Sequence, residues 1–159
     1  YVQIHSFISK RLVEYDYGIV SHALCSAMDE LLNDYTNLVE SLHVKYRQPA
    51  RHSTTTSNTL SSSSSLTLSG LYSQLQPSIR TMNILKHLVD KTQYSKGGAL
   101  LNTIENIYQT EYIGDDRAHK IIQFLYERSA IPFMDMLSTW MESGTLHDPY
   151  NEFMIEEKR

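Results

Sequence analysis

Cysteine, glycine and proline are all scarce in this chain of 159 residues. The one cysteine, Cys25, excludes a disulfide framework and an all-cysteine metal cluster. Six glycines and four prolines are too few for a turn-rich all-β fold. The length suits one domain of ordinary size with a proper core.

An excess of positive charge and a long apolar run are also missing. The chain carries 14 Lys and Arg against 18 Asp and Glu, a formal charge of −4. That balance lacks the net basic field of a general nucleic-acid binder, so we expect no nucleic-acid partner. The most apolar stretch, 18–28, is interrupted by Ser21, His22 and Ser26. It falls short of the roughly 18 apolar residues of a membrane span, so we expect no membrane partner.

The two ends of the sequence suggest a fragment. Tyr1 stands beside a weak helical pattern over 2–14, and no signal-peptide pattern opens the chain. At the other end, Phe153 is followed within a few residues by charged side chains without a stop signal. We therefore expect 1–159 to be a fragment of a larger soluble intracellular protein.

The strongest pattern is a stripe of apolar residues over 17–46. The spacing of 4, 3, 4, 3 and 4 residues is typical of helices that pack at a shallow angle; the stripe consists of Leu24, Met28, Leu31, Tyr35, Leu38 and Leu42. A helix of thirty residues is about 45 Å long, which predicts an elongated bundle rather than a sphere.

A stretch rich in Ser and Thr follows this predicted helix. From Ser53 to Ser69, 13 of 17 residues are Ser or Thr. Such a stretch buries too little apolar surface to offset the entropy of ordering it, so we predict a disordered insert over 48–67. Two interpretations stay open, a passive insertion and a phosphorylated regulatory loop.

Helical patterns resume from Leu68 to the end of the chain. Pro77 either kinks the next helix or begins a second one, and Gly97-Gly98 ends the helical pattern that contains it. Pro132 opens a further helix that stops at Gly144. About six helices and one short strand result. The predicted fold is all-α, an elongated multi-helix bundle with a disordered loop and a short extended C-terminal segment over 145–155. The helix over 17–46 should pack against 68–94 and 118–129.

The predicted core combines the stripe with later apolar positions. Its members are Leu24, Met28, Leu31, Leu38, Ile121, Leu125, Phe133 and Trp140. Aromatic and methionine side chains at helical spacing are more often core than a cofactor site.

Residues capable of chemistry are present, but none forms a convincing site. His147-Asp148 is similar to a ligand pair of HD-type metal hydrolases, yet a polar turn before Pro149 explains it better. His22 and Cys25 lack further zinc ligands. Four carboxylates occur in two close groups, and helix N-terminal placement accounts for the second group; they are Glu14, Asp16, Asp115 and Asp116. We predict no catalytic residue, no metal and no cofactor, and therefore no enzyme.

Several strings of this sequence resemble one protein family in the right order. Residues 17–28, which contain His22, and residues 75–82, which contain Arg80, are two of them. Residues 97–101 and 130–140 are two more. The most specific string, 147–157, contains His147, Asp148, Pro149, Tyr150, Glu152 and Phe153. Together they resemble the N-terminal region of gamma-tubulin complex components, in the component 2 branch.

The resemblance implies a function that spacing alone does not. Members hold gamma-tubulin and assemble into a ring that templates microtubules, and their N-terminal region makes lateral contacts between neighbouring components. The implied partners are a component 3-like neighbour, gamma-tubulin through other parts of the protein, and a spindle-pole receptor. The implied location is the cytoplasm and cytoskeleton, at the spindle pole body or centrosome. An unrelated helical adaptor or tethering bundle is the alternative function. Residues 147–153 either fix the join to the next part of the protein or only cap the local bundle.

Overall fold

The computed structural model describes residues 1–13, 17–47 and 67–155, and this part of the chain consists of helices without a strand. The helices are α1 (Val2–Val13), α2 (Ile19–Arg47), α3 (Leu68–Thr92), α4 (Gly97–Thr110) and α5 (Asp116–Ser143). The all-α prediction is confirmed. The expected strand is wrong for the described residues, because 144–155 forms turns instead.

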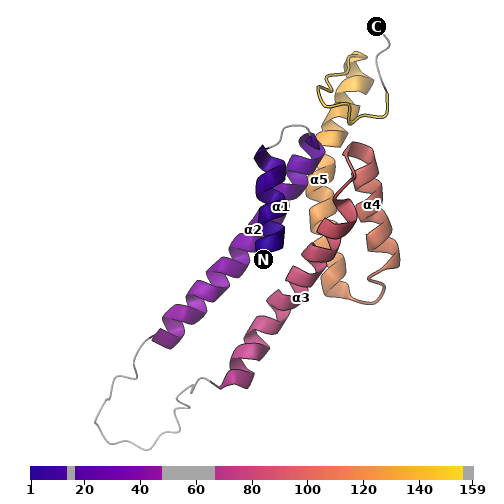
Figure 1. Ribbon diagram of the computed structural model, residues 1–159. Coiled ribbons are helices and arrows are strands. Elements are labelled where there is room, and N and C mark those ends of the chain that lie inside the picture. The colour runs from indigo at the N-terminus through magenta and orange to yellow at the C-terminus, as the bar shows by residue number, and fades with distance from the viewer. Residues whose placement is uncertain (14–16, 48–66, 156–159) are drawn as a thin grey trace, which may run out of the picture.

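The helices form an elongated bundle (Figure 1). α2 packs chiefly against α5, α1 lies along α2, and α3 packs chiefly against α4 and α1. The second half of α2 and the first half of α3 extend beyond the body at one end (Figure 1). The segment after α5 covers the opposite end. The expected packing of α2 directly on α3 is therefore wrong for most of their length.

Two prolines lie inside helices rather than at their starts. Pro77 is within α3 and Pro132 is within α5, so the further helix expected at Pro132 does not exist. Proline leaves the carbonyl four residues earlier without its helical partner. Those residues, Ser73 and Arg128, are exposed, where water can bond the carbonyl.

The ends of α3, α4 and α5 follow their sequence signals in part. Asp115 caps α5 by accepting hydrogen bonds from the amides of Arg117 and Ala118, both at 3.1 Å. Gly144 ends α5 in the left-handed conformation, as predicted. Gly97 begins α4 instead of ending α3, which already stops at Thr92.

The predicted insert over 48–67 lies outside the described residues except for Thr67. Thr67 accepts a hydrogen bond from the Gly70 amide at 3.2 Å and caps α3. Glu14 and Asp16, from the first group of carboxylates, also lie outside the described residues.

The core takes buried apolar residues from all five helices, and the face of α2 toward α5 is part of it. Leu24, Met28, Leu125 and Phe133 are buried there. Leu31 and Ile121 are only partly buried against the core. For Leu31 on α2, the reason is that a straight helix turns about 20° per heptad away from a 3.5-residue stripe. Leu32 takes the buried position expected of Leu31.

The two remaining predicted core residues lie outside the core. Leu38 is half-buried on the part of α2 that leaves the body. Trp140 is 36% exposed near the end of α5, so it anchors the last turn from the edge rather than from within.

A buried arginine links the first three helices. Arg11 of α1 is 2% exposed, and its Nη2 donates to the carbonyl oxygens of Thr92 at 2.8 Å and Gln93 at 2.7 Å. Its Nη1 donates to the hydroxyl of Ser21 on α2 at 3.3 Å. Carbonyls at a helix C-terminus lack helical partners and attract positive charge. Arg11 therefore caps α3 from another helix.

Aromatic rings complete the surroundings of Arg11. Its guanidinium carbon lies 4.5 Å from the ring centre of Phe7 and 4.7 Å from that of Tyr17. Burial lowers the pKa of Arg11, while Cys25 and Tyr17 act in the opposite direction. The rings and carbonyls replace the water that the charge loses.

We predict that Arg11→Met lowers the free energy of unfolding by about 2–3 kcal/mol, because charge-assisted hydrogen bonds to α3 are lost while the apolar stem is kept. Urea denaturation of the purified region measures the change. The matched control is Lys10→Met, one residue away on the exposed face. A stability equal to that of the control would contradict the role of Arg11.

Candidate functional site

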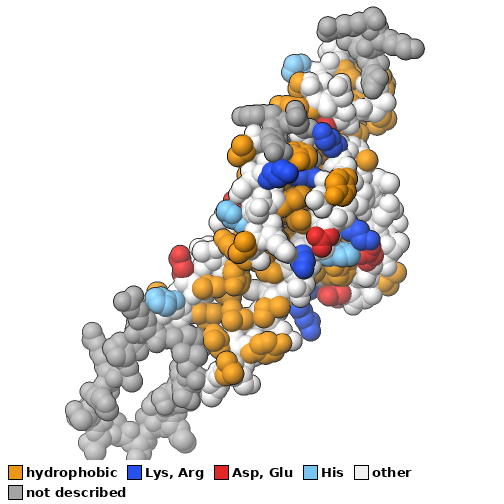
Figure 2. Space-filling model, in the orientation of Figure 1, with side chains coloured by type: hydrophobic (Ala, Val, Ile, Leu, Met, Phe, Trp, Pro, Cys, Tyr) orange, Lys and Arg blue, Asp and Glu red, His pale blue; other side chains and the backbone are white. Residues whose placement is uncertain are grey.

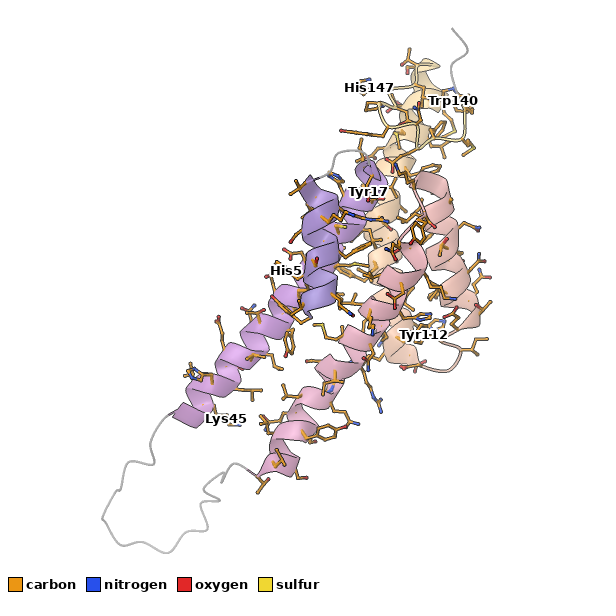
Figure 3. All side chains as sticks on the ribbon, viewed as in Figure 1. His5, Tyr17, Lys45, Tyr112, Trp140 and His147 are labelled. Atoms are coloured by element: carbon orange, nitrogen blue, oxygen red, sulfur yellow. The ribbon has the colours of Figure 1, made fainter. Side chains whose placement is uncertain are left out.

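The segment after α5 folds into a tight turn that Asp148 organises. Asp148 Oδ1 accepts a hydrogen bond from the amide of Tyr150 at 3.2 Å, and Oδ2 accepts one from the amide of Phe153 at 2.6 Å. Asn151 adopts a positive φ of 54°, a conformation that asparagine tolerates better than most residues. The carboxylate of Asp148 thus serves the turn, and His147 and Pro149 are exposed beside it (Figure 3).

The turn directs Glu152 into the bundle. Glu152 is 7% exposed, and its Oε2 accepts hydrogen bonds from the amides of Ile19 at 2.6 Å and Val20 at 3.2 Å. These amides open α2, where the helix dipole favours a negative charge. Glu152 is therefore the N-terminal cap of a helix more than 130 residues earlier in the chain.

Two glycines leave room for Glu152. A Cβ atom on Gly18 would lie 2.1 Å from the carboxyl carbon of Glu152, and one on Gly97 would lie 2.5 Å from its backbone oxygen. Both glycines have positive φ, +84° and +51°, which favours glycine independently. We call Glu152, Gly18 and Gly97 the Glu152 clamp, which joins the starts of α2 and α4 to the segment after α5.

Phe153 secures the other side of the same segment. It is buried, with its ring centre 5.5 Å from that of Phe133 and 6.2 Å from that of Trp140. Trp140 lies near the end of α5 (Figure 3). The segment is thus packed along α5 as well as bonded to α2.

Four of the strings picked out in the sequence meet at this clamp. Residues 17–28 and 97–101 supply the glycines, 130–140 supplies Phe133 and Trp140, and 147–157 supplies Glu152 and Phe153. Arg80 is apart from them, exposed on α3. Tyr150 is half-buried in the turn. In this geometry residues 147–153 cap one end of the local bundle, as the second interpretation of this segment expects.

The clamp carboxylate is shifted toward its neutral form. Burial raises the pKa of Glu152 above its ordinary value of 4.5. The amides of Val20, Ile19 and Gly97 lower that pKa, and the nearby charge of Asp148 raises it further. Burial therefore outweighs the hydrogen bonds.

The surface also has two apolar grooves beside α2. The first, which we call the α2–α5 groove, has a volume of about 480 Å³ and is lined by Leu12, Ile19, His22, Ala23, Ile131 and Pro132. Glu30 and Arg128 face each other at 3.9 Å on its edge. His22 thus lines a groove. Ile19 and Ile131 are exposed within it.

The second groove lies where α2 and α3 leave the body. We call it the arm groove; its volume is about 290 Å³, and it is lined by Leu31, Tyr35, Leu38, Ser78, Met82 and Ile121. Figure 2 shows hydrophobic side chains along this extended part of the bundle. Leu38 and Ile121, expected in the core, therefore line a groove.

Two observations on the described residues concern the candidate metal ligands and the cysteine. No group of three or more His, Cys, Asp or Glu within them is placed to hold a metal ion. Cys25 is fully buried, and burial raises the pKa of its thiol to about 11, with Arg11 acting in the opposite direction. A buried thiol of that kind is a packing residue rather than a nucleophile.

Comparison with known families identifies the chain. The family model described as "Gamma tubulin complex component N-terminal" matches residues 1–159. The chain belongs to the gamma-tubulin complex component family. Gamma-tubulin complex component 2 of Mus musculus is 32% identical over 99% of this chain and 16% of the relative. The family assignment made from the strings is thus confirmed.

Two other relatives are named as a spindle pole body component and as a component 3 homolog. Spindle pole body component alp4 of Schizosaccharomyces pombe is 28% identical over 98% of this chain and 23% of the relative. The Gamma-tubulin complex component 3 homolog of Xenopus laevis is 29% identical over 96% of this chain and 16% of the relative. This gamma-tubulin complex component region therefore spans about a fifth of the length of the curated relatives it matches. Within its described part, no helix is both long and apolar enough to cross a membrane.

We predict that Gly18→Ala destabilises the bundle by about 1–3 kcal/mol more than Gly114→Ala does, because the new methyl group overlaps the Glu152 carboxylate. Gly114 is the matched control: its φ of +93° is similar, and a Cβ atom there would meet nothing within 4 Å. Thermal or urea unfolding of the two variants gives the difference. Equal losses would show that backbone strain alone, and not the clamp, acts at Gly18.

A second prediction concerns pH. Because the folded pKa of Glu152 is raised, its contribution is present below the unfolded value of 4.5 and is lost as pH rises through the higher folded value. The unfolding free energy of the unsubstituted protein, relative to Glu152→Gln, should therefore fall as pH increases from 4.5 toward neutrality. A relative stability that rises over this range would mean that the pKa is lowered instead.

Proposed function

We propose that this region is a rigid, non-catalytic scaffold of a gamma-tubulin complex subunit, and that it makes lateral contacts with a neighbouring component. The observation that carries the proposal is the family match over residues 1–159. A component 2-like position is the more specific form, supported by the 32% identity to the mouse component. Within the complex, this subunit would help to template microtubule nucleation at the spindle pole body or centrosome.

Rigidity is supported by the two buried charges. Arg11 ties α1 and α2 to the end of α3, and the Glu152 clamp ties α2 and α4 to the segment after α5. Removing one partner of a buried polar contact is costly, so such contacts hold elements in one arrangement. A template for microtubules needs fixed spacing between its subunits, which such a bundle can supply.

Lateral contact is supported by the two grooves. A row of like folds needs two different contacting faces on each chain, since head-to-tail contacts are heterologous. The α2–α5 groove and the arm groove are separate apolar surfaces, lined by different residues of α2. Relatives named as component 2 and component 3 both match this region, which makes a component 3-like chain the fitting neighbour.

The remaining partners follow from the same assignment. This chain covers about a fifth of the length of its relatives, and contact with gamma-tubulin itself is proposed for other parts of the protein. A spindle-pole receptor is a further proposed partner. The alternative of an unrelated adaptor bundle has no support from a particular observation.

We predict that Ile131→Asp in the full-length protein reduces co-purification of the component 3-like neighbour at least tenfold. The exposed Ile131 lines the α2–α5 groove, so a charge there opposes apolar contact without disturbing the core. The matched control is Ile113→Asp, an exposed isoleucine in the turn between α4 and α5.

The co-purification experiment has three informative outcomes, which test the groove as a lateral face and the scaffold function separately. Loss with Ile131→Asp alone supports the groove as the lateral face. If both variants retain the component 3-like neighbour equally, the groove is not the lateral face, but the scaffold function still stands. Failure of the unsubstituted protein to co-purify with gamma-tubulin and a component 3-like chain would contradict the scaffold function itself.

A further inference from the structure

A small pocket lies between α4 and α5 and shares no residue with either groove. The two helices pack side by side (Figure 1), and the pocket between them has a volume of about 240 Å³. Its walls combine two tyrosines with two glutamates and a glutamine: Glu105, Tyr108, Gln123, Tyr126 and Glu127. We call it the tyrosine pocket.

The two tyrosines of the pocket are held in place by the body of the bundle. Tyr108 and Tyr126 are partly buried against the core, and the ring centre of Tyr108 lies 4.4 Å from that of His119. The parts of the two side chains that the core leaves uncovered line the pocket. Because the face of an aromatic ring attracts a cation, two fixed tyrosines favour a positively charged ligand.

The two carboxylates of the pocket are positioned by glutamines. Gln109 Nε2 donates to Glu105 Oε1 at 2.5 Å, and Gln123 Nε2 donates to Glu127 Oε1 at 2.8 Å. The second oxygen of each glutamate, Oε2, takes no part in these bonds. The salt bridges within the described part of the chain involve other glutamates. The pocket therefore presents two negative charges that these residues leave without a salt bridge.

The size and the lining of the pocket select among cations. Pockets for drug-sized molecules have about 300–1,000 Å³, so one of about 240 Å³ fits a single side chain. Arginine suits both parts of the lining, because its planar guanidinium stacks on aromatic rings and donates to carboxylates. The same bundle already holds the guanidinium of Arg11 over the rings of Phe7 and Tyr17.

We propose that the tyrosine pocket binds an arginine side chain presented by a basic segment of a partner protein. Phosphate groups carry the same sign of charge as the two glutamates, which disfavours nucleic acid and anionic lipid as ligands. Binding there is separate from the proposed lateral contacts, because the pocket and the α2–α5 groove have no residue in common.

Peptide selection on the full-length protein tests the proposal. The probe is a phage-displayed library of short random peptides, and each selected peptide is synthesised with arginine and with citrulline, which keeps the shape but lacks the charge. We expect arginine-rich peptides whose affinity falls about tenfold when the bound arginine becomes citrulline. A selection without arginine enrichment, or citrulline peptides that bind equally well, would overturn the proposal.

Paired variants locate the binding on the protein. Glu105→Gln combined with Glu127→Gln should weaken the affinity for the selected peptides about tenfold. The matched control, Glu40→Gln combined with Glu142→Gln, removes two exposed charges elsewhere and should leave the affinity unchanged. Equal losses in the two proteins would mean attraction by net charge alone, and no loss in either would place the peptides elsewhere. Each of these results would overturn the proposal.

A change of one ring tests the aromatic part of the pocket. Tyr126→Leu keeps an apolar side chain against the core but removes the ring, so the affinity should fall about fivefold; thermal unfolding checks that the variant is folded. Unchanged affinity in the folded variant would contradict contact between arginine and this ring. Ile131→Asp should keep full peptide binding, so failure of the lateral contacts and failure of this pocket are distinguishable.

Discussion

The hydrogen bonds from the amides of Ile19 and Val20 to the buried carboxylate of Glu152 are the contact on which this bundle depends most. They bring the last described segment back to the beginning of the longest helix. The clamp requires glycine at positions 18 and 97, a turn organised by Asp148, and an aromatic support from Phe133 and Trp140. A string that looks in sequence like a binding motif is therefore first a structural one. Its exposed members, His147 and Pro149, are the ones left for other contacts.

Arg11 performs the complementary task at the other kind of helix end. Glu152 places a carboxyl acceptor at the start of α2, and Arg11 places a positively charged donor at the end of α3. Each side chain satisfies backbone groups that helix geometry leaves without partners. The two contacts involve all five helices or the segments beside them, so the body is fixed by polar contacts as well as by its apolar core. The two grooves are apolar surfaces that these polar contacts leave uncovered.

Helix periodicity and the capping residues Asp115 and Gly144 were enough to predict the fold class, the elongated shape and most helix positions. Periodicity alone could not place Leu31 or Trp140, because a 3.5-residue stripe drifts around a straight helix and because burial depends on where the neighbouring helix ends. The helix start predicted at Pro132 was wrong, since α5 continues through this proline and Arg128, whose carbonyl loses its helical partner, is an exposed residue. Arg11 carried no sequence signal, because its partners on α3 are about eighty residues away. The strings containing Gly18, Gly97 and Glu152 were visible, but only the fold brings them together.

The structure of the assembled complex, determined by electron cryo-microscopy, tests the account most directly. The account predicts a neighbouring component bound at the α2–α5 groove, with Glu152 still bonded to the start of α2. Gamma-tubulin should contact parts of the full-length protein outside residues 1–159. A complex in which this groove faces solvent and gamma-tubulin itself contacts residues 1–159 would contradict it.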